Sequence, residues 1–261
     1  MVLHGLLDSS EGWTPVCKAV DGKRIAFDLP GFGHSDAPQK GSIAGYAADV
    51  SEGLEELGIG RFTLIGHSLG GAIAAALAES MPDRVRALVL LAPAGFGRLP
   101  LAEAVSIPGV RNLVQTALPF ALASGVAVRA GYMTIVSHGM APDRALVERV
   151  TSRGGELVAG AREGTRAVVE AGRADNAFHH RRMLYRGPVY GVWGDRDRLV
   201  PTSHHRGVRR AFPQAQIEFW PGMGHHATCE RFDELLELVK RVVASSEPAS
   251  SRSASAQGRA A

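Results

Sequence analysis

Short apolar segments alternate with helical patterns along the first 96 residues of the chain. Segments rich in Val, Ile, Leu and Phe, bounded by Gly, Pro or charged residues, predict buried parallel strands at Met1–His4, Arg24–Asp28, Arg61–Gly66 and Val85–Ala92. Apolar positions three and four residues apart predict a helix over Ile43–Gly58, and a run of Ala and Gly predicts another over Leu69–Ser80. Such alternation is typical of an α/β fold with right-handed crossovers.

The pattern changes after Phe96, where helical periodicities recur without a clear strand as far as Arg186. The helices expected in this stretch are Val110–Leu118, Ala121–His138, Pro142–Arg153 and Glu156–Ala171. Strand signals return at Pro188–Gly194 and Ala215–Trp220, and they alternate with expected helices at Ser203–Phe212 and Glu230–Ala244. The sequence therefore predicts an α/β core from residues 1–96 and 187–246, interrupted by an all-helical cap over residues 97–186. Residues 247–261, rich in Ser, Ala and Arg, are expected to be a disordered tail.

The strongest local motif is Gly66-His67-Ser68-Leu69-Gly70, which stands between an expected strand and an expected helix. Glycines on both sides of Ser68 allow the strand and the helix to pack around a strained turn. The hydroxyl is then exposed at the carboxyl edge of the sheet, beside the positive end of the helix dipole. The motif predicts that Ser68 is a nucleophile, and a chance match in a glycine-rich chain is the alternative.

A serine nucleophile needs a histidine base, and the histidine needs a carboxylate that fixes its tautomer. His225 follows the last expected strand, where Gly224 gives the backbone freedom to turn the imidazole toward Ser68; the neighbouring His226 competes for the role. Asp195 and Asp197 both follow the strand at Pro188–Gly194, and either could be the acid. Asp195 is nearer the strand end and is expected to bond turn amides instead.

An oxyanion hole needs two backbone N–H groups beside the nucleophile. Leu69 supplies one, because it directly follows Ser68, and Leu6 is expected to supply the other from the loop after the first strand. Gly5 allows that loop to approach closely, and His4 is expected to be structural, bonding loop carbonyls.

Over roughly residues 1–244, the chain resembles the α/β-hydrolase superfamily. The matching motifs are His4-Gly5, Asp28–Ser35, Gly66–Gly71, Gly194–Pro201 and Gly222–His225. The resemblance implies an α/β-hydrolase fold with a mostly parallel sheet of about six strands and a helical cap. It also implies Ser68 as nucleophile, His225 as base, and as acid Asp197, the aspartate three residues after Gly194. The nucleophilic Asp of haloalkane dehalogenases and epoxide hydrolases is excluded, because Ser68 stands in its place.

The chain departs from the superfamily pattern at its start. Family members usually carry two further strands before the strand that ends in His-Gly, and here those two strands are missing. We therefore expect the strand at Arg24–Asp28 to lie at a sheet edge. A wrongly assigned start is the favoured explanation, and a shortened sheet is the alternative.

The leading functional hypothesis is a serine hydrolase that cleaves a carboxylic ester or related acyl bond of a small molecule through an acyl-enzyme. A C–C bond hydrolase of ring-cleavage diketone acids is the first alternative, because residues 97–186 hold 12 Arg against 7 Asp or Glu and an Arg could clamp a carboxylate. These arginines could equally form a solvated outer face. A homologue that binds a small ligand without turnover is the second alternative.

Composition excludes several other classes of protein. The net charge is +3, and no basic run is interleaved with aromatic residues, so no nucleic-acid partner is expected. The two cysteines make neither a disulfide framework nor a zinc knuckle, and the pairs His179-His180 and His204-His205 lack further ligands, so no metal or other cofactor is expected. No apolar run reaches about 20 residues, so a membrane span is not expected. A cytoplasmic location is expected instead. The apolar segment Leu113–Val128 is expected to line the cap over the pocket, with a lid that touches lipid as the alternative.

Overall fold

A parallel six-stranded sheet forms the centre of the molecule in the computed structural model, which describes residues 1–36, 38, 41–172 and 178–246. The strands are β1 (Val2–Leu3), β2 (Ala26–Phe27), β3 (Phe62–His67), β4 (Val85–Leu91), β5 (Val189–Gly194) and β6 (Gln216–Trp220). Their order across the sheet is β2-β1-β3-β4-β5-β6, and every pairing is parallel. The predicted α/β class and six-stranded parallel sheet are confirmed. As expected, β2 lies at the edge and pairs with β1.

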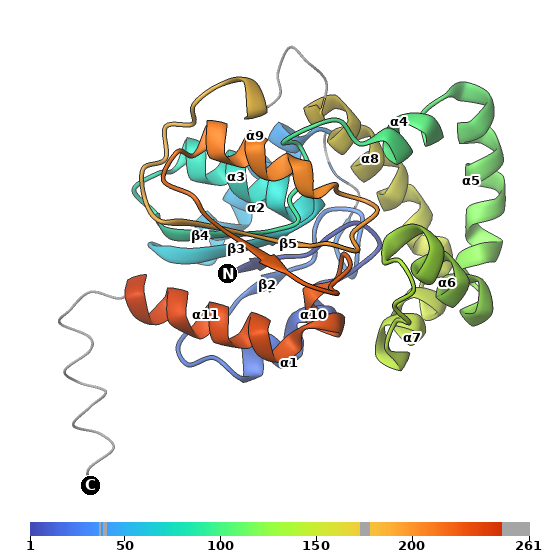
Figure 1. Cartoon of the computed structure of the whole chain (residues 1–261), viewed down its shortest axis with the longest axis horizontal. Helices are drawn as coiled ribbons and strands as arrows, with labels where there is room; N and C mark the ends of the chain where they lie inside the picture. The colour runs from blue at the N-terminus through green and yellow to red at the C-terminus, as the bar shows by residue number, and fades with distance from the viewer. Residues whose placement is uncertain (37, 39–40, 173–177, 247–261) are drawn as a thin grey trace, which may run out of the picture.

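Helices cover both faces of the sheet (Figure 1). One face carries α2 (Ile43–Glu56), α3 (Leu69–Ser80) and α9 (His205–Ala211), and the other carries α1 (Thr14–Lys18) and α11 (Phe232–Ser246). Successive side chains of a strand point to opposite faces, so β4 contributes Leu88 and Leu90 to one hydrophobic core and Val89 to the other. A strand buried on both faces must be apolar throughout, which explains the continuous apolar runs in the sequence.

The segment between β4 and β5 is largely helical and lies beside the end of the sheet to which the strands point (Figure 1). Its helices are α4 (Pro100–Val105), α5 (Pro108–Leu122), α6 (Gly125–Gly131), α7 (Arg144–Ser152) and α8 (Gly154–Gly172), with a π-helix at Tyr132–Val136 and a short 3₁₀ helix at Phe178–His180. We retain residues 97–186 as the proposed cap.

The structure differs from the sequence-based expectations at three places. The helix expected over Ala121–His138 is broken, because the Ser124 side chain accepts a hydrogen bond from the Ala127 amide and begins a new helix there. The helices α1 and α4 were not predicted at all; both are short and carry a proline at the first or second residue, so their apolar periodicity is weak. The segment Leu113–Val128 turns only part of its large side chains inward, since Leu122 is 6% exposed whereas Leu113 and Phe120 are 70% and 77% exposed.

The remaining core helices follow β5 and β6 along the chain. The helix expected over Ser203–Phe212 is a 3₁₀ turn at Thr202–His204 followed by α9, and the one expected over Glu230–Ala244 is α10 (Ala227–Glu230) followed by α11. Among the described residues, no helix has the length and apolar character that crossing a membrane requires. The tail predicted over residues 247–261 lies outside the described residues.

Candidate active site

Ser68 occupies a strained turn between β3 and α3. Its φ of 54° and ψ of −115° lie outside the regions that non-glycine residues ordinarily adopt. The glycines on either side are required by space: a Cβ on Gly66 would lie 2.4 Å from the Gly70 carbonyl oxygen, and a Cβ on Gly70 would lie 2.4 Å from the Leu3 carbonyl oxygen. The turn therefore has the tight strand-to-helix geometry that the sequence motif predicts.

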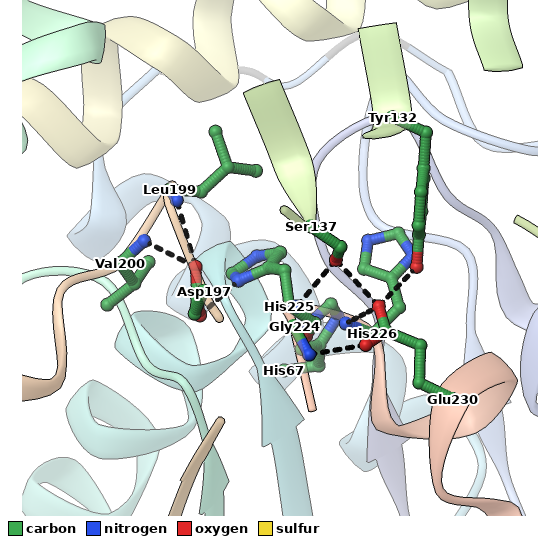
Figure 2. A network of polar contacts seen from close by, with 10 residues as sticks. All are labelled: His67, Tyr132, Ser137, Asp197, Leu199, Val200, Gly224, His225, His226 and Glu230. Atoms are coloured by element: carbon green, nitrogen blue, oxygen red, sulfur yellow. Dashed lines mark hydrogen bonds and ion pairs between the residues drawn. The ribbon is translucent and has the colours of Figure 1, made fainter. Parts of the chain in front are cut away.

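Asp197 and His225 are hydrogen-bonded to each other in the interior (Figure 2). The His225 Nδ1–H group donates to Asp197 Oδ2 at 2.7 Å, and the two side chains are 2% and 0% exposed. The other carboxylate oxygen, Oδ1, accepts the backbone N–H groups of Leu199 at 2.8 Å and Val200 at 2.9 Å. Asp195 instead accepts the Gly222 amide at 2.7 Å, as the sequence analysis expected.

His67 joins the nucleophile turn to the loop of His225. Its Nε2–H group donates to the His225 carbonyl oxygen at 2.8 Å, and the centroids of the two rings lie 4.7 Å apart. Burial, followed by the proximity of His225, holds the pKa of His67 well below its usual value, so the ring is neutral at neutral pH. Ser68 is the next residue in the chain, so His67 joins the backbone of the nucleophile turn to the backbone of the His225 loop.

His226, the competing base, has different partners. Its ring packs against His67 and Tyr132 at centroid distances of 4.9 and 5.4 Å, while the hydrogen bond to Asp197 belongs to His225. Burial and the neighbouring His225 lower the pKa of His226 to about 3. A ring with so low a pKa is a poor proton acceptor at neutral pH.

Leu6 and Leu69, which are expected to form the oxyanion hole, have side chains close to one glycine of α8. A Cβ on Gly5 would lie 3.2 Å from Ser68 Cβ, so the loop after β1 approaches the nucleophile as closely as predicted. A Cβ on Gly164 of α8 would lie 2.5 Å from Leu6 Cδ1 and 3.1 Å from Leu69 Cδ2. The side chains of Leu6 and Leu69 therefore meet at one glycine of the proposed cap.

His4 and the loop after β2 have structural contacts. The His4 ring accepts the Leu29 amide at Nε2 (3.0 Å) and donates from Nδ1 to the Gly5 carbonyl oxygen (2.7 Å), and burial lowers its pKa. Asp28 accepts the amides of Ser10 at 2.7 Å and His34 at 3.0 Å. These bonds fix the turn over residues 28–36.

Sequence reasoning missed two residues that contact the His225 loop, Ser137 and Glu230. Ser137 is fully buried, and its Oγ accepts the His225 amide at 2.8 Å and donates to Glu230 Oε1 at 2.6 Å. Ser137 fell inside a predicted helix and Glu230 at the start of another, so no local pattern set them apart. Gly224 is the one sequence signal that could have indicated this contact, because its missing side chain leaves the space that Ser137 fills.

Three histidines offer a geometry that a metal ion could use. One ring nitrogen each of His67, His225 and His226 lie within 4.8 Å of one another. Both His225 and His67 already commit a ring nitrogen to a hydrogen bond, with Asp197 and with the His225 carbonyl respectively. Each of these bonds uses one nitrogen and leaves the other nitrogen of the ring uncommitted. A carboxylate or carbonyl partner of this kind orients histidines in metal sites as well as in proton transfer.

Comparison with known proteins identifies the family. A family model described as the alpha/beta hydrolase fold matches residues 1–127. An uncharacterized protein of Mycobacterium tuberculosis is 30% identical over 259 residues, which cover 95% of this chain and 76% of the relative. A 2-hydroxy-6-oxononadienedioate/2-hydroxy-6-oxononatrienedioate hydrolase of Burkholderia vietnamiensis is 28% identical, with 92% and 86% covered. The mouse sn-1-specific diacylglycerol lipase is 26% identical, with 93% and 80% covered. The chain belongs to the α/β-hydrolase superfamily, and its relatives and fold indicate a hydrolase.

Proposed function

We propose that the protein is a serine hydrolase that cleaves a carboxylic ester, or a related acyl bond, of a small molecule through an acyl-enzyme. The observation that carries the proposal is the buried 2.7 Å bond between His225 Nδ1 and Asp197, beside a strained Ser68 turn. A carboxylate that accepts the Nδ1 proton leaves Nε2 of the ring as the proton acceptor, which is the tautomer a general base requires.

In the proposed mechanism, Ser68 Oγ attacks the carbonyl carbon of the substrate while His225 Nε2 takes the hydroxyl proton. Asp197 stabilises the imidazolium that forms. The N–H groups of Leu6 and Leu69 stabilise the charge on the carbonyl oxygen, assisted by the N-terminus of α3. His225 then gives its proton to the leaving group and accepts one from the water that hydrolyses the acyl-enzyme.

The experiment compares Ser68→Ala with Ser80→Ala on p-nitrophenyl esters of short and medium chain length. Ser80 ends the same helix and bonds only within it, so it is a matched control. Removing the nucleophile should lower kcat by at least about 10³-fold, because only the oxyanion hole and binding would remain. The control should keep the parent rate, and unchanged hydrolysis by Ser68→Ala would refute the proposal.

C–C hydrolysis of a diketone acid is the second candidate, and one cap arginine favours it. Several cap arginines pair with acidic neighbours at the surface, among them Arg144 with Glu148 and Arg166 with Glu170. Arg149 differs, since its side chain is 21% exposed, lies 3.8 Å from the buried Asp8, and helps to lower the pKa of His226. A partly buried cation near His226 suits a substrate carboxylate, and the relative from Burkholderia vietnamiensis bears the name of a hydrolase of a dioate.

Comparing turnover of a ring-cleavage diketone acid with turnover of a neutral ester decides between the two reactions. Preference for the acid, lost in Arg149→Gln, would favour C–C hydrolysis. A fluorophosphonate probe tests the remaining alternative, because a chain that only binds its ligand would leave Ser68 unlabelled.

A further inference from the structure

The loop that carries His225 is held on three sides (Figure 2). Asp197 accepts the proton of the ring Nδ1, and His67 donates to the backbone carbonyl. The third contact comes from the proposed cap, because the His225 amide donates to Ser137 Oγ at 2.8 Å. Ser137 follows the π-helix Tyr132–Val136 and also forms an isolated antiparallel bridge with Asp197. One cap residue is therefore paired with the backbones of both the proposed acid and the proposed base.

The Glu230 carboxylate accepts hydrogen bonds from the donors around this contact. Its Oε1 accepts the hydroxyls of Tyr132 and Ser137, both at 2.6 Å, and the His226 amide at 3.3 Å. Its Oε2 accepts the Gly224 amide. A carboxylate suits four donors because it only accepts hydrogen bonds. Burial and the nearby Glu230 raise the pKa of Tyr132, so the phenol keeps its proton and stays a donor.

We propose that Glu230 is a positioning residue for the reaction and acts through Ser137 on the backbone of His225. The inference rests on the proposed serine-hydrolase function. The Ser137 hydroxyl has one proton, which it gives to Glu230, so an oxygen lone pair remains to accept the His225 amide. The Glu230 carboxylate thereby orients the Ser137 hydroxyl, and the hydroxyl fixes the position of the His225 backbone, from which the imidazole side chain extends.

The close fit at Gly224 supports a specific contact. A Cβ there would lie 2.1 Å from Ser137 Oγ and 2.9 Å from Glu230 Oε2. Conformational freedom is not what this glycine supplies, because the positive φ in the loop belongs to Gly222. The sequence-based explanation of Gly224 was therefore wrong. The residue is small so that Ser137 and Glu230 reach the backbone.

The experiment measures kcat, KM and fluorophosphonate labelling of Glu230→Gln and Ser137→Ala. An amide in place of the carboxylate must turn its NH₂ group either to the Gly224 amide or to the two hydroxyls, so the set of four donors is no longer satisfied. Ser137→Ala keeps Glu230 but removes the acceptor of the His225 amide. Asp195→Asn is the matched control, because Asp195 bonds the amide of Gly222 in the same loop without touching His225.

Both variants should lower kcat and the labelling rate of Ser68 by about 10- to 100-fold, with KM within about threefold, because a small displacement of a catalytic group costs rate and not ground-state binding. The far-downfield proton resonance of the His225–Asp197 bond should shift or broaden. The Asp195→Asn control should stay within about threefold of the parent in kcat, since no bond to His225 is lost. The double variant should be no slower than the slower single variant, since both residues act along one path.

Three results would overturn the inference. The first is parent kcat in both single variants, the second is loss that is additive in the double variant, and the third is unfolding of both, which would make the network purely structural. Should Glu230→Gln alone unfold, Ser137→Ala carries the test. If Ser68→Ala also keeps full activity, the proposed function itself fails; if Ser68→Ala is inactive while Glu230→Gln and Ser137→Ala are normal, the positioning role alone fails.

Discussion

Replacement of Asp197 by asparagine should stop the proposed reaction while leaving the shape of the site intact. The reason lies in the two backbone amides of Leu199 and Val200, which donate to Asp197 Oδ1 at 2.8 and 2.9 Å. In Asp197→Asn those amides hold the side-chain oxygen, so the NH₂ group must face His225 Nδ1. The imidazole then has to accept at Nδ1 and carry its proton on Nε2, where it cannot take the proton of Ser68.

The expected loss is about 10⁴-fold in kcat, the effect that the same tautomer error produces in other Ser-His-Asp enzymes, and it corresponds to about 5.5 kcal/mol of transition-state stabilisation. KM should change little, because the carboxylate is 0% exposed and no substrate can reach it. The assay is steady-state hydrolysis of a p-nitrophenyl ester, together with the urea unfolding midpoint. A folded Asp197→Asn protein with kcat within tenfold of the parent would refute the reasoning and return Asp195 to consideration as the acid.

Two further predictions concern stability. Gly224→Ala places a Cβ 2.1 Å from Ser137 Oγ, so it should destabilise the fold by about 1–3 kcal/mol through overpacking and lower the activity as well. Urea unfolding measures the loss of stability, and a midpoint equal to that of the parent protein would contradict the close contact. Stability should also depend on pH, because burial lowers the pKa of His226 from 6.5 to about 3. Between these pH values the unfolded chain binds more protons than the folded one, so the free energy of unfolding rises by about 1.4 kcal/mol per pH unit for this one group. The stability that the neutral His226 ring contributes is therefore lost as the pH falls below 6.5. His226→Gln should reduce the measured slope by about that amount, and an unchanged slope would show that the fold does not lower the pKa of His226.

The sequence alone determined much of the fold, because its signals are local. The continuous apolar runs follow from strands that are covered on both faces, and the stretch Leu69–Ser80 became α3 with the predicted bounds. The glycines around Ser68 were recognisable since the turn has no space for a side chain at either position. The motifs also distinguished Asp195 from Asp197, and the structure gives these residues the hydrogen bonds that the motifs suggested.

Only the tertiary structure decided which residues from distant parts of the chain meet. Ser137 and Glu230 are 93 residues apart, and neither belongs to a motif, so no periodicity could join them. The exposed side chains of Leu113 and Phe120 show the same limit, since a helical stripe reveals that a face is apolar and not what it faces. Propensity and spacing act over a few residues, whereas the contacts that hold His225 form when the segment between two strands folds back over the end of the sheet.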